Sequence, residues 1–453
     1  MFEPCILSYK SHDLYVTTLM KLNSSISYVS VKKASRILEQ FILHNRVLNY
    51  ETVYVRNCYK RVLAENIVAD NDIPAFDSSH MDGYAVKADD IIHASEQSPV
   101  VLRVKQEKIQ PMKAVPPDYI LQRQEAFRIS TGGYLPRGAN TVVPLEDTQA
   151  SNRKSEVRIF RFLPAGSFVY SKGRDVKKDH EVLKRGRILR PQDIGLLESL
   201  YITKITVFRR PRIAIISTGS ELTSNKKNVK SGKILEKHSG IISKLVEEVG
   251  GISFRMGIVP DDVTKIRNKV EQAISRSMDL ILTLGGSSMG EHDLVEAAIK
   301  SMGVPQIFFH GVKLDRGRVT GVAITKGRPI IIMPGPIQGA INAFIVFACP
   351  IIKLLSGQSV GKPITLGARL GQEWVARKRF PNFLKVVYVH LRSKENGEYE
   401  ADCVPGDTET LTTFTRSNGY IIVDEKTTFI KSGARVKVNL LPGLSYVNSQ
   451  LEI

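Results

Sequence analysis

The chain contains the run DLILTLGGSSMGEHD at residues 279–293, and this run decides the fold class. Its apolar first half predicts a fully buried strand, and the glycine pair predicts the loop that ends it. Glycines and serines in such a loop let the backbone approach an anionic ligand closely. Asp293 stands just before a helix predicted over 294–300. By itself, a glycine pair after a strand is only a weak signal of a ligand site.

Apolar strands alternate with helical patterns on both sides of this run. An apolar stretch at 212–217 ends in a Thr-Gly loop, and a further strand is predicted at 329–333. Helical spacing predicts helices over 240–249 and 262–275. This alternation predicts a doubly wound parallel sheet covered on both faces. Ligands of such sheets bind at the carboxyl ends of the strands, where these loops fall.

The flanking regions follow other patterns. Residues 29–68 have helical spacing, and residues 74–176 consist of short apolar runs broken by Gly and Pro. Residues 187–200 return to a helical pattern, so the β-rich module is predicted to be an insertion. From about residue 366 short strands predict a small C-terminal β domain.

Composition places the chain among ordinary globular proteins. Hydrophobic residues make up 42% and charged residues 24% of the 453 positions, a length that suits roughly three or four domains. The four cysteines are scattered without zinc-like spacing, which favours a reducing cytoplasm. The most apolar stretch, 340–352, is short and contains Pro350, so we expect a buried helix and no membrane span. The N-terminus lacks the pattern of a secretion signal.

The formal net charge of +19 predicts attraction to anions without naming them. No zinc finger, RNA-binding aromatic pattern or recognition helix is evident, so nucleic acid is not an expected partner. The densest basic stretch, 226–237, is interpreted as a solvated loop. An anion site in that stretch is the less favoured alternative.

A second informative run is PAFDSSHMDGYAV at 74–86. It places hydroxyls and a carboxylate beside a flexible glycine, after a proline that sets an extended start. Physical reasoning alone favours a turn-forming role for Asp82 over a catalytic one. As a whole, the run resembles the signature loop of the molybdopterin molybdenumtransferases, the MoeA and gephyrin E-domain family.

Further blocks resemble the same family and follow its order from about residue 29 to 443. RISTGGYLPRGAN (128–140) resembles Thr-Gly-Gly/Ala-x-x-Pro-x-Gly-Ala-Asp, with Asn at the last position, and GRDV (173–176) resembles Gly-Glu-Asp-Ile. STGSEL (217–222) resembles Ser-Thr-Gly-Asp-Glu-Leu, and the glycine loop before Asp293 resembles the pterin-binding Gly-Gly-x-Ser-x-Gly-x-x-Asp block. Each block alone also fits an ordinary polar turn.

The remaining blocks depart most from the family. MPGPIQGA (333–340) corresponds to Leu-Pro-Gly-Asn-Pro-x-Ser, and LDRGRV (314–319) corresponds to Ile-Lys-Pro-Gly-Lys-Pro. EKHS (236–239) falls where an Asp-Ser/Thr-Asn run is usual. The residues that depart from the family pattern in the matched blocks include Ser220, His238, Asp315 and Ile337. The sequence leaves open whether these substitutions change the activity or abolish it.

The resemblance implies a multidomain α/β plus β subunit that forms an elongated homodimer. Each active site is then expected between the α/β domain of one subunit and the N-terminal region of the other. The predicted division is an N-terminal extension of no assigned role (1–28), a discontinuous helical and β linker domain (29–72 and 164–208), an inserted β-rich domain (73–163), an α/β molybdopterin-binding domain (209–357) and a C-terminal β-barrel domain (358–453).

The resemblance also implies a reaction in molybdenum cofactor biosynthesis. Molybdate or tungstate would be inserted into adenylylated molybdopterin with release of AMP. Because the substrates are anions, the carboxylates of the motifs would repel them unless a hard cation such as Mg²⁺ intervened. The expected Mg²⁺ ligands are Glu221, Asp261 and Asp293.

The roles that the resemblance implies for single residues follow the matched motifs. Asp82 and Asp175 are the expected catalytic residues. The expected substrate-binding residues are Ser79, Thr131, Ser217, Thr218, Glu221, Gly285, Gly286, Ser288, Asp293, Arg318 and Pro334. A related adenylyltransferase is disfavoured because it lacks the Asp82 loop and the C-terminal barrel. The alternative from another class is a catalytically weakened paralogue that binds molybdopterin, cofactor or partner proteins without turnover.

Overall fold

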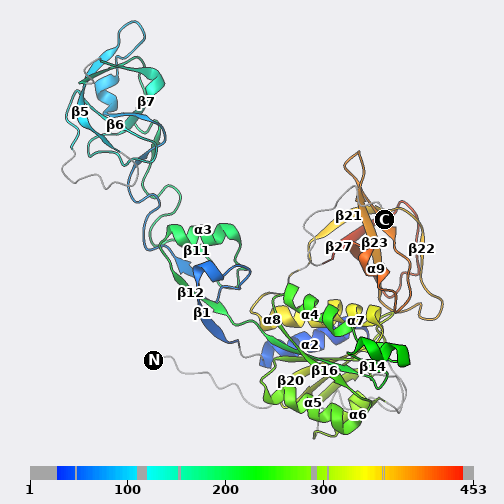
Figure 1. The fold of residues 1–453 in the computed structure, drawn as a ribbon. Helices are drawn as coiled ribbons and strands as arrows, with labels where there is room; N and C mark the ends of the chain where they lie inside the picture. The colour runs from blue at the N-terminus through cyan, green and yellow to red at the C-terminus, as the bar shows by residue number, and fades with distance from the viewer. Residues whose placement is uncertain are drawn as a thin grey trace, which may run out of the picture. The chain divides into compact units, whose positions relative to one another are not determined.

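The computed structural model describes residues 28–45, 48–109, 120–151, 155–286, 293–303, 306–359, 361 and 363–441. These residues form two compact units, whose elements are labelled in Figure 1. The smaller unit spans Thr52–Val207, and the larger unit combines the chain up to Glu51 with the chain from Phe208 onward. The smaller unit is therefore an insertion, and the division falls within strands β1 (Tyr50–Tyr54) and β12 (Lys204–Phe208).

A six-stranded sheet forms the centre of the larger unit, in the order β16-β13-β17-β20-β19-β18. The strands are β13 (Arg212–Thr218), β16 (Ile252–Val259), β17 (Leu280–Leu284), β18 (Gln306–His310), β19 (Gly321–Thr325) and β20 (Arg328–Met333). Strands β16, β13, β17 and β20 run parallel, which confirms the predicted doubly wound core. The apolar runs of β13, β17 and β20 are buried because helices cover both faces.

One edge of the sheet departs from the predicted parallel arrangement. Strand β19 pairs antiparallel with β20, and β18 pairs antiparallel with β19. The turn between β19 and β20 consists of Lys326 and Gly327, whose φ angles are 48° and 72°. Positive φ at both central residues is the geometry of a two-residue type I′ hairpin, and such a hairpin joins antiparallel strands.

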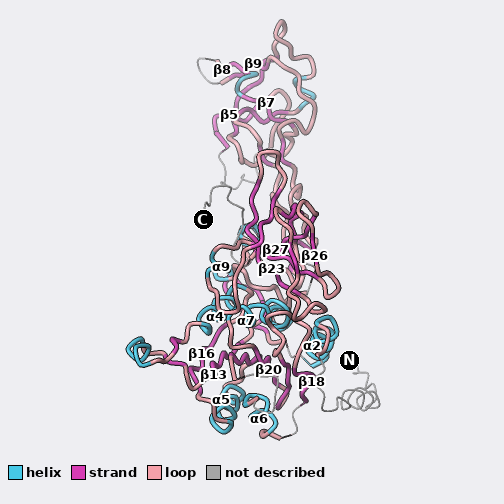
Figure 2. The backbone as a smooth tube through the Cα atoms, turned by 90° about the vertical axis from the view of Figure 1, so that its right-hand side faces the viewer, coloured by secondary structure: helices cyan, strands magenta, loops and turns pink. Residues whose placement is uncertain are grey.

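Helices cover both faces of this sheet, as Figures 1 and 2 show. One face carries α2 (Val31–Asn45), α4 (His238–Glu248) and the continuous run α7 (Ile337–Ala343), η5 (Phe344–Ala348, a π turn) and α8 (Cys349–Leu355). The other face carries α5 (Val263–Ser275) and α6 (Leu294–Lys300). The helices predicted over 240–249, 262–275 and 294–300 are thus present within two residues of their expected ends.

Helix α2 is shorter than the predicted helical region over 29–68. Its buried residues recur at helical spacing, and β1 begins five residues after its end because aromatic and β-branched residues favour a strand there. Those buried residues are Val31, Ala34, Leu38 and Ile42. They join the hydrophobic core on one face of the α/β sheet.

The helical run Ile337–Leu355 is the one stretch, among the described residues, that is long and apolar enough to cross a membrane. In the fold, 72% of its most apolar window is buried. It packs against the sheet and against α2, as the core helix of a globular domain does. The expectation of a buried helix in this region is confirmed, although the helix runs on through Pro350, which lies in the first turn of α8.

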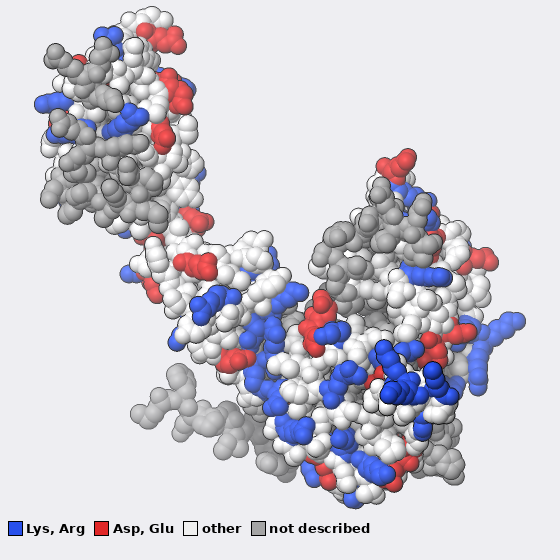
Figure 3. All heavy atoms as spheres, viewed as in Figure 1, with Lys and Arg blue, Asp and Glu red and all other residues white. Residues whose placement is uncertain are grey.

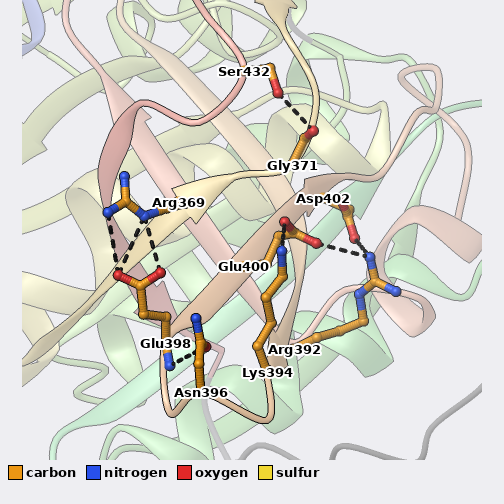
Figure 4. Close-up of polar contacts among 9 residues, drawn as sticks. All are labelled: Arg369, Gly371, Arg392, Lys394, Asn396, Glu398, Glu400, Asp402 and Ser432. Atoms are coloured by element: carbon orange, nitrogen blue, oxygen red, sulfur yellow. Dashed lines mark hydrogen bonds and ion pairs between the residues drawn. The ribbon is translucent and has the colours of Figure 1, made fainter.

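The C-terminal part of the larger unit is a closed barrel of order β21-β24-β23-β25-β27, as predicted. Its strands are β21 (Thr365–Leu370), β23 (Lys385–Ser393), β24 (Tyr399–Cys403), β25 (Gly419–Val423) and β27 (Arg435–Leu440), with β22 (Trp374–Val375), β26 (Phe429–Ile430) and α9 (Thr412–Thr415) around it. Figure 4 shows charged side chains facing one another across β23 and β24. Arg392 on β23 and Lys394, the first residue after β23, both pair with Glu400 on β24.

The smaller unit holds a second six-stranded sheet, in the order β7-β4-β6-β5-β9-β8. Its strands are β4 (Gly83–Val86), β5 (Val100–Ile109), β6 (Glu125–Ile129), β7 (Thr141–Pro144), β8 (Thr148–Ala150) and β9 (Glu156–Ile159). Shorter elements are β2 (Ile67–Val68), β3 (Ser78–Ser79), β10 (Val169–Tyr170), β11 (Glu181–Leu183), α3 (Pro191–Ser199) and the 3-10 turns η1 (Val55–Asn57), η2 (Ala88–Ile91) and η3 (Leu145–Asp147). The expected β-rich region and the helix after residue 187 are present, while the predicted domain boundaries stay predictions.

Candidate active site

A pocket of about 520 Å³ lies in the larger unit, where β13 and β17 end. This is the edge of a parallel sheet at which ligands are expected. Six of the residues selected from the sequence line it: Ser217, Thr218, Glu221, Asp261, Gly285 and Gly286. The loop that follows β20 contributes Gly335 and Pro336. The structure therefore brings these three motif blocks to one cavity, and residues of the EKHS block (236–239) line it as well.

The glycine pair after β17 allows two loops to meet at the pocket. Gly285 and Gly286 have φ angles of +90° and +62°, a backbone region that disfavours other residues. A Cβ atom on Gly285 would lie 2.5 Å from the Thr218 carbonyl oxygen, and one on Gly286 would lie 2.5 Å from Thr218 Oγ1. No larger residue fits, so the backbone of this loop stays open to a ligand in the pocket.

Two carboxylates are held near the end of β13. The Glu221 side chain folds back over Gly219, where a Cβ atom would lie 2.6 Å from Glu221 Oε1. Asp261 and Ser220 form a reciprocal pair: the Ser220 backbone N–H donates to Asp261 Oδ2, and the Asp261 backbone N–H donates to Ser220 Oγ, both at 2.9 Å. Ser220, which replaces the usual acid, thus orients the neighbouring acid.

Glu236 is a pocket residue that the sequence reasoning did not select. It follows β15 (Ile234–Leu235), which pairs with β14 (Leu222–Thr223) at the pocket wall. Its carboxylate accepts hydrogen bonds from Ser239 N at 2.7 Å and Ser239 Oγ at 2.6 Å, and Arg255 Nη2 lies 3.3 Å away. Burial opposes its charge, but these donors outweigh burial and hold the pKa of Glu236 below its usual value.

His238 is a second pocket residue that was not selected as a site residue from the sequence. It was noted there only as a departure from the family pattern. It begins α4, and its side chain is 21% exposed. Its Nδ1 atom lies 3.0 Å from the Gly335 carbonyl oxygen, and its Nε2 atom lies 3.9 Å from Glu409 Oε2. Glu409 comes from the loop between β24 and α9 of the barrel. The sequence does not predict that His238, Gly335 and Glu409 lie together, because they come from separate parts of the chain that meet only in the folded structure.

Several predicted site residues lie away from the pocket lining. Asp293 caps α6 by accepting a hydrogen bond from Glu296 N at 2.7 Å, and its Oδ2 lies 3.2 Å from His310 Nε2. Its side chain is only 3% exposed. Arg318 stacks over the Phe380 ring, and Pro334 is buried. Ser288 lies outside the described residues.

The remaining predicted residues belong to the smaller unit. Asp82 Oδ1 accepts hydrogen bonds from Thr131 N at 2.7 Å and Thr131 Oγ1 at 3.1 Å, so two predicted motif blocks meet there. Ser79 is buried, and its hydroxyl donates to the Met81 carbonyl at 2.5 Å. Asp175 is exposed, and its backbone N–H donates to Ile73 O at the start of the Asp82 loop.

The donor set at the pocket suits a cation that is bound partly by substrate. Within the described ranges, no group of three or more His, Cys, Asp or Glu side chains could hold a metal by itself. Mg²⁺ is usually bound through one or two carboxylates together with substrate phosphates, and does not need an all-protein cage. Glu221 and Asp261 are two such carboxylates in one pocket. The Asp293 carboxylate already binds the helix end and His310.

Three family models match consecutive parts of the chain. The MoeA N-terminal region (domain I and II) matches residues 29–200, a probable molybdopterin binding domain matches 214–354, and the MoeA C-terminal region (domain IV) matches 367–441. A molybdopterin molybdenumtransferase of Nostoc sp. is 30% identical over 388 residues, which are 84% of this chain and 86% of the relative. The chain belongs to the molybdopterin molybdenumtransferase family.

Other relatives and solved structures agree with this family. Molybdopterin molybdenumtransferase 2 of Mycobacterium tuberculosis is 32% identical over 72% of this chain and 80% of its own length. A molybdopterin biosynthesis MoeA protein from Pyrococcus horikoshii has a TM-score of 0.76 at 28% identity, covering 92% of this chain and 100% of its own. Membership makes this chain an enzyme of molybdenum cofactor biosynthesis that acts on a molybdopterin-related substrate.

Proposed function

We propose that this enzyme inserts molybdate, or tungstate, into adenylylated molybdopterin and releases AMP. The observation that carries this proposal is the pocket at the ends of β13 and β17. There Gly285 and Gly286 open the backbone toward a ligand, while Glu221 and Asp261 offer oxygen ligands beside them. A substrate with phosphate groups needs both kinds of donor, because the carboxylates alone would repel it.

Each group of residues has a distinct part in this proposal. Ser217 and Thr218 supply hydroxyls, and the glycine loop supplies backbone amides for the pterin and phosphate groups. Glu221 and Asp261 would hold Mg²⁺, which neutralises charge on the phosphates. Asp82 and Asp175, on the smaller unit, are proposed to act at the transfer of the metal oxyanion and the cleavage of the adenylyl bond.

The state of assembly forms part of the proposal. We infer a homodimer in solution in which the Asp82 loop of one subunit serves the reaction in the other, as the family resemblance implies. Light scattering combined with size-exclusion chromatography should give twice the mass of the 50.5 kDa chain. A monomer that turns over substrate would contradict the dimer without affecting the proposed reaction.

The deciding experiment is a turnover assay on the full chain. Purified protein, adenylylated molybdopterin and Mg²⁺ are mixed with molybdate or tungstate, and AMP is followed over time. We expect AMP release that depends on the oxyanion, and the preferred oxyanion names the metal. Tight substrate binding without AMP would favour the alternative, a paralogue that binds cofactor without turnover. Asp315 favours that alternative, because an acid replaces the usual lysine there.

A further inference from the structure

His238 lines the pocket, and its hydrogen bond to Gly335 fixes the tautomer of its neutral ring. The Gly335 carbonyl, 3.0 Å from Nδ1, can only accept a hydrogen bond. The neutral ring must therefore carry its proton on Nδ1 and leave a lone pair on Nε2. The same hydrogen bond supports the imidazolium that forms when Nε2 takes up a proton.

The neighbours of His238 make it the residue best suited to move a proton in this pocket. The titratable side chains that line the pocket with it are Glu221, Glu236, Lys237, Asp261 and Glu409. Among the described lining residues His238 is the one imidazole, and imidazole is the side chain whose charge changes most readily between pH 5 and 8. Glu236 is committed to Ser239 and Arg255.

Glu409, an acid beside His238, can stabilise the charged form of the ring without blocking it. Glu409 Oε2 lies 3.9 Å from Nε2, too far for a hydrogen bond but within range of an ion pair. The Glu409 side chain is 61% exposed, so solvent weakens this attraction. A water or substrate oxygen can approach Nε2 in the pocket while the Nδ1 bond holds the ring.

We propose that His238 is the general base for AMP release, an inference that rests on the proposed function. Water attacks the adenylyl phosphorus, and Nε2 of His238 takes the proton that the water loses. A new P–O bond forms, and the bond from that phosphorus to the bridging oxygen breaks. The proton then passes from Nε2 to the departing molybdopterin phosphate, so AMP leaves and the molybdopterin that receives the oxyanion is released with atoms and charge balanced.

The test compares AMP release by the full-length wild-type protein and H238A across pH 5.5 to 8.5. General-base catalysis contributes about 10²- to 10⁴-fold, so we expect the rate of H238A to fall by about 10²-fold or more. Because a general base acts only in its unprotonated form, the pH profile of H238A should differ from that of the wild type. Added imidazole should raise the rate of AMP release by H238A at least about tenfold, because a free base can occupy the space that the His238 ring leaves.

H390A is the matched control. His390 Nδ1 also lies near a backbone carbonyl, that of Arg416 at 3.2 Å, but His390 is on the barrel and does not line the pocket. H390A should keep wild-type rates with and without imidazole. H238Q, which retains a polar side chain, replaces H238A if H238A does not fold.

The outcomes separate this inference from the proposed function. Wild-type protein that releases no AMP contradicts the proposed function itself. Wild-type turnover with an H238A rate within threefold of it overturns only the role of His238. A folded H238A that is slow, unrescued by imidazole and unchanged in pH profile also overturns it, because that pattern indicates a structural role.

Discussion

Ser220 shows how a substituted residue can preserve the arrangement of a site. The family string carries an acid at this position, and here the serine hydroxyl accepts the backbone N–H of Asp261. In return the Ser220 backbone N–H donates to the Asp261 carboxylate. Losing one acid therefore leaves the other held at the pocket, which favours retuned activity over lost activity. Ile337 differs, because it is fully buried in the sheet core and its substitution concerns packing.

Asp82 carries the sharpest prediction at the scale of single residues. Thr131 holds its carboxylate through two hydrogen bonds, so D82N should keep the loop shape while removing the charge. Loss of a charge that acts on the reacting groups costs about 10²- to 10³-fold in turnover. We expect that loss in AMP release, with an unchanged thermal melting curve. D77N is the control, because Asp77 lies in the same loop as Asp82 and its carboxylate likewise accepts a backbone hydrogen bond, from Lys172 N. A fully active D82N would remove Asp82 from the mechanism.

Helix α3 depends on one buried carboxylate at its start. Asp193 is 3% exposed and accepts hydrogen bonds from the side chains of Arg187 and Arg190 and from the Arg190 backbone. Burial opposes the charge, but these donors outweigh it and hold the pKa of Asp193 well below its usual value. The helix start is therefore stabilised by a charged group that unfolding exposes.

The pH dependence of this contribution has a definite sign. Because the folded-state pKa of Asp193 is lowered, its stabilisation is complete above the ordinary aspartate pKa of about 3.9 and is lost as pH falls below it. D193N should cost about 2 to 3 kcal/mol of unfolding free energy at pH 7, and the difference from wild type should shrink below about pH 4. Urea denaturation at pH 7 and below about pH 4 measures this difference in the free energy of unfolding. D70N is the control, because Asp70 is exposed. A difference that grows in acid would contradict the sign.

The charged ladder on the barrel should contribute much less (Figure 4). Glu400 on β24 pairs with Arg392 on β23 and with Lys394 just after β23, and these two basic side chains are 51% and 49% exposed. Exposed pairs of this kind are worth about 0.2 to 1 kcal/mol and weaken in salt. E400Q should therefore lower the free energy of unfolding by at most about 1 kcal/mol in 50 mM NaCl and by less in 500 mM. A larger loss that salt does not change would show that the pair is effectively buried.

At the scale of the whole molecule, sequence patterns predicted the features that depend on local residue pattern, such as buried strands. The apolar runs at 212–217 and 280–284 predicted buried parallel strands, and the structure contains both. The hairpin at Lys326 was missed because its positive φ angle has no strong sequence signal at a lysine. His238 was missed as a pocket residue because its neighbours Gly335 and Glu409 reach it only through tertiary packing.

The net charge of +19 leads to the last prediction, which concerns how substrate arrives. The segment between β14 and β15 contains four lysines at positions 226, 227, 230 and 233, and both strands line the pocket. Basic side chains gather around β14 in Figure 3. The segment has a fixed turn, since Asn225 caps η4 (Lys226–Ser231) by accepting from Lys227 N. These lysines offset the carboxylates of the pocket for an anionic substrate.

Electrostatic attraction of this kind raises association rates and is screened by salt. The triple variant K226Q/K227Q/K230Q should lower kcat/KM for adenylylated molybdopterin about three- to tenfold at 20 mM salt, leave kcat unchanged and flatten the dependence on ionic strength. The control K426Q/K431Q/K437Q removes the same charge from exposed positions on the barrel that do not line the pocket. Equal losses in both variants would mean that only total charge matters. An unchanged kcat/KM in the first variant would contradict this role and indicate that the segment between β14 and β15 is only a solvated loop, as its composition predicts.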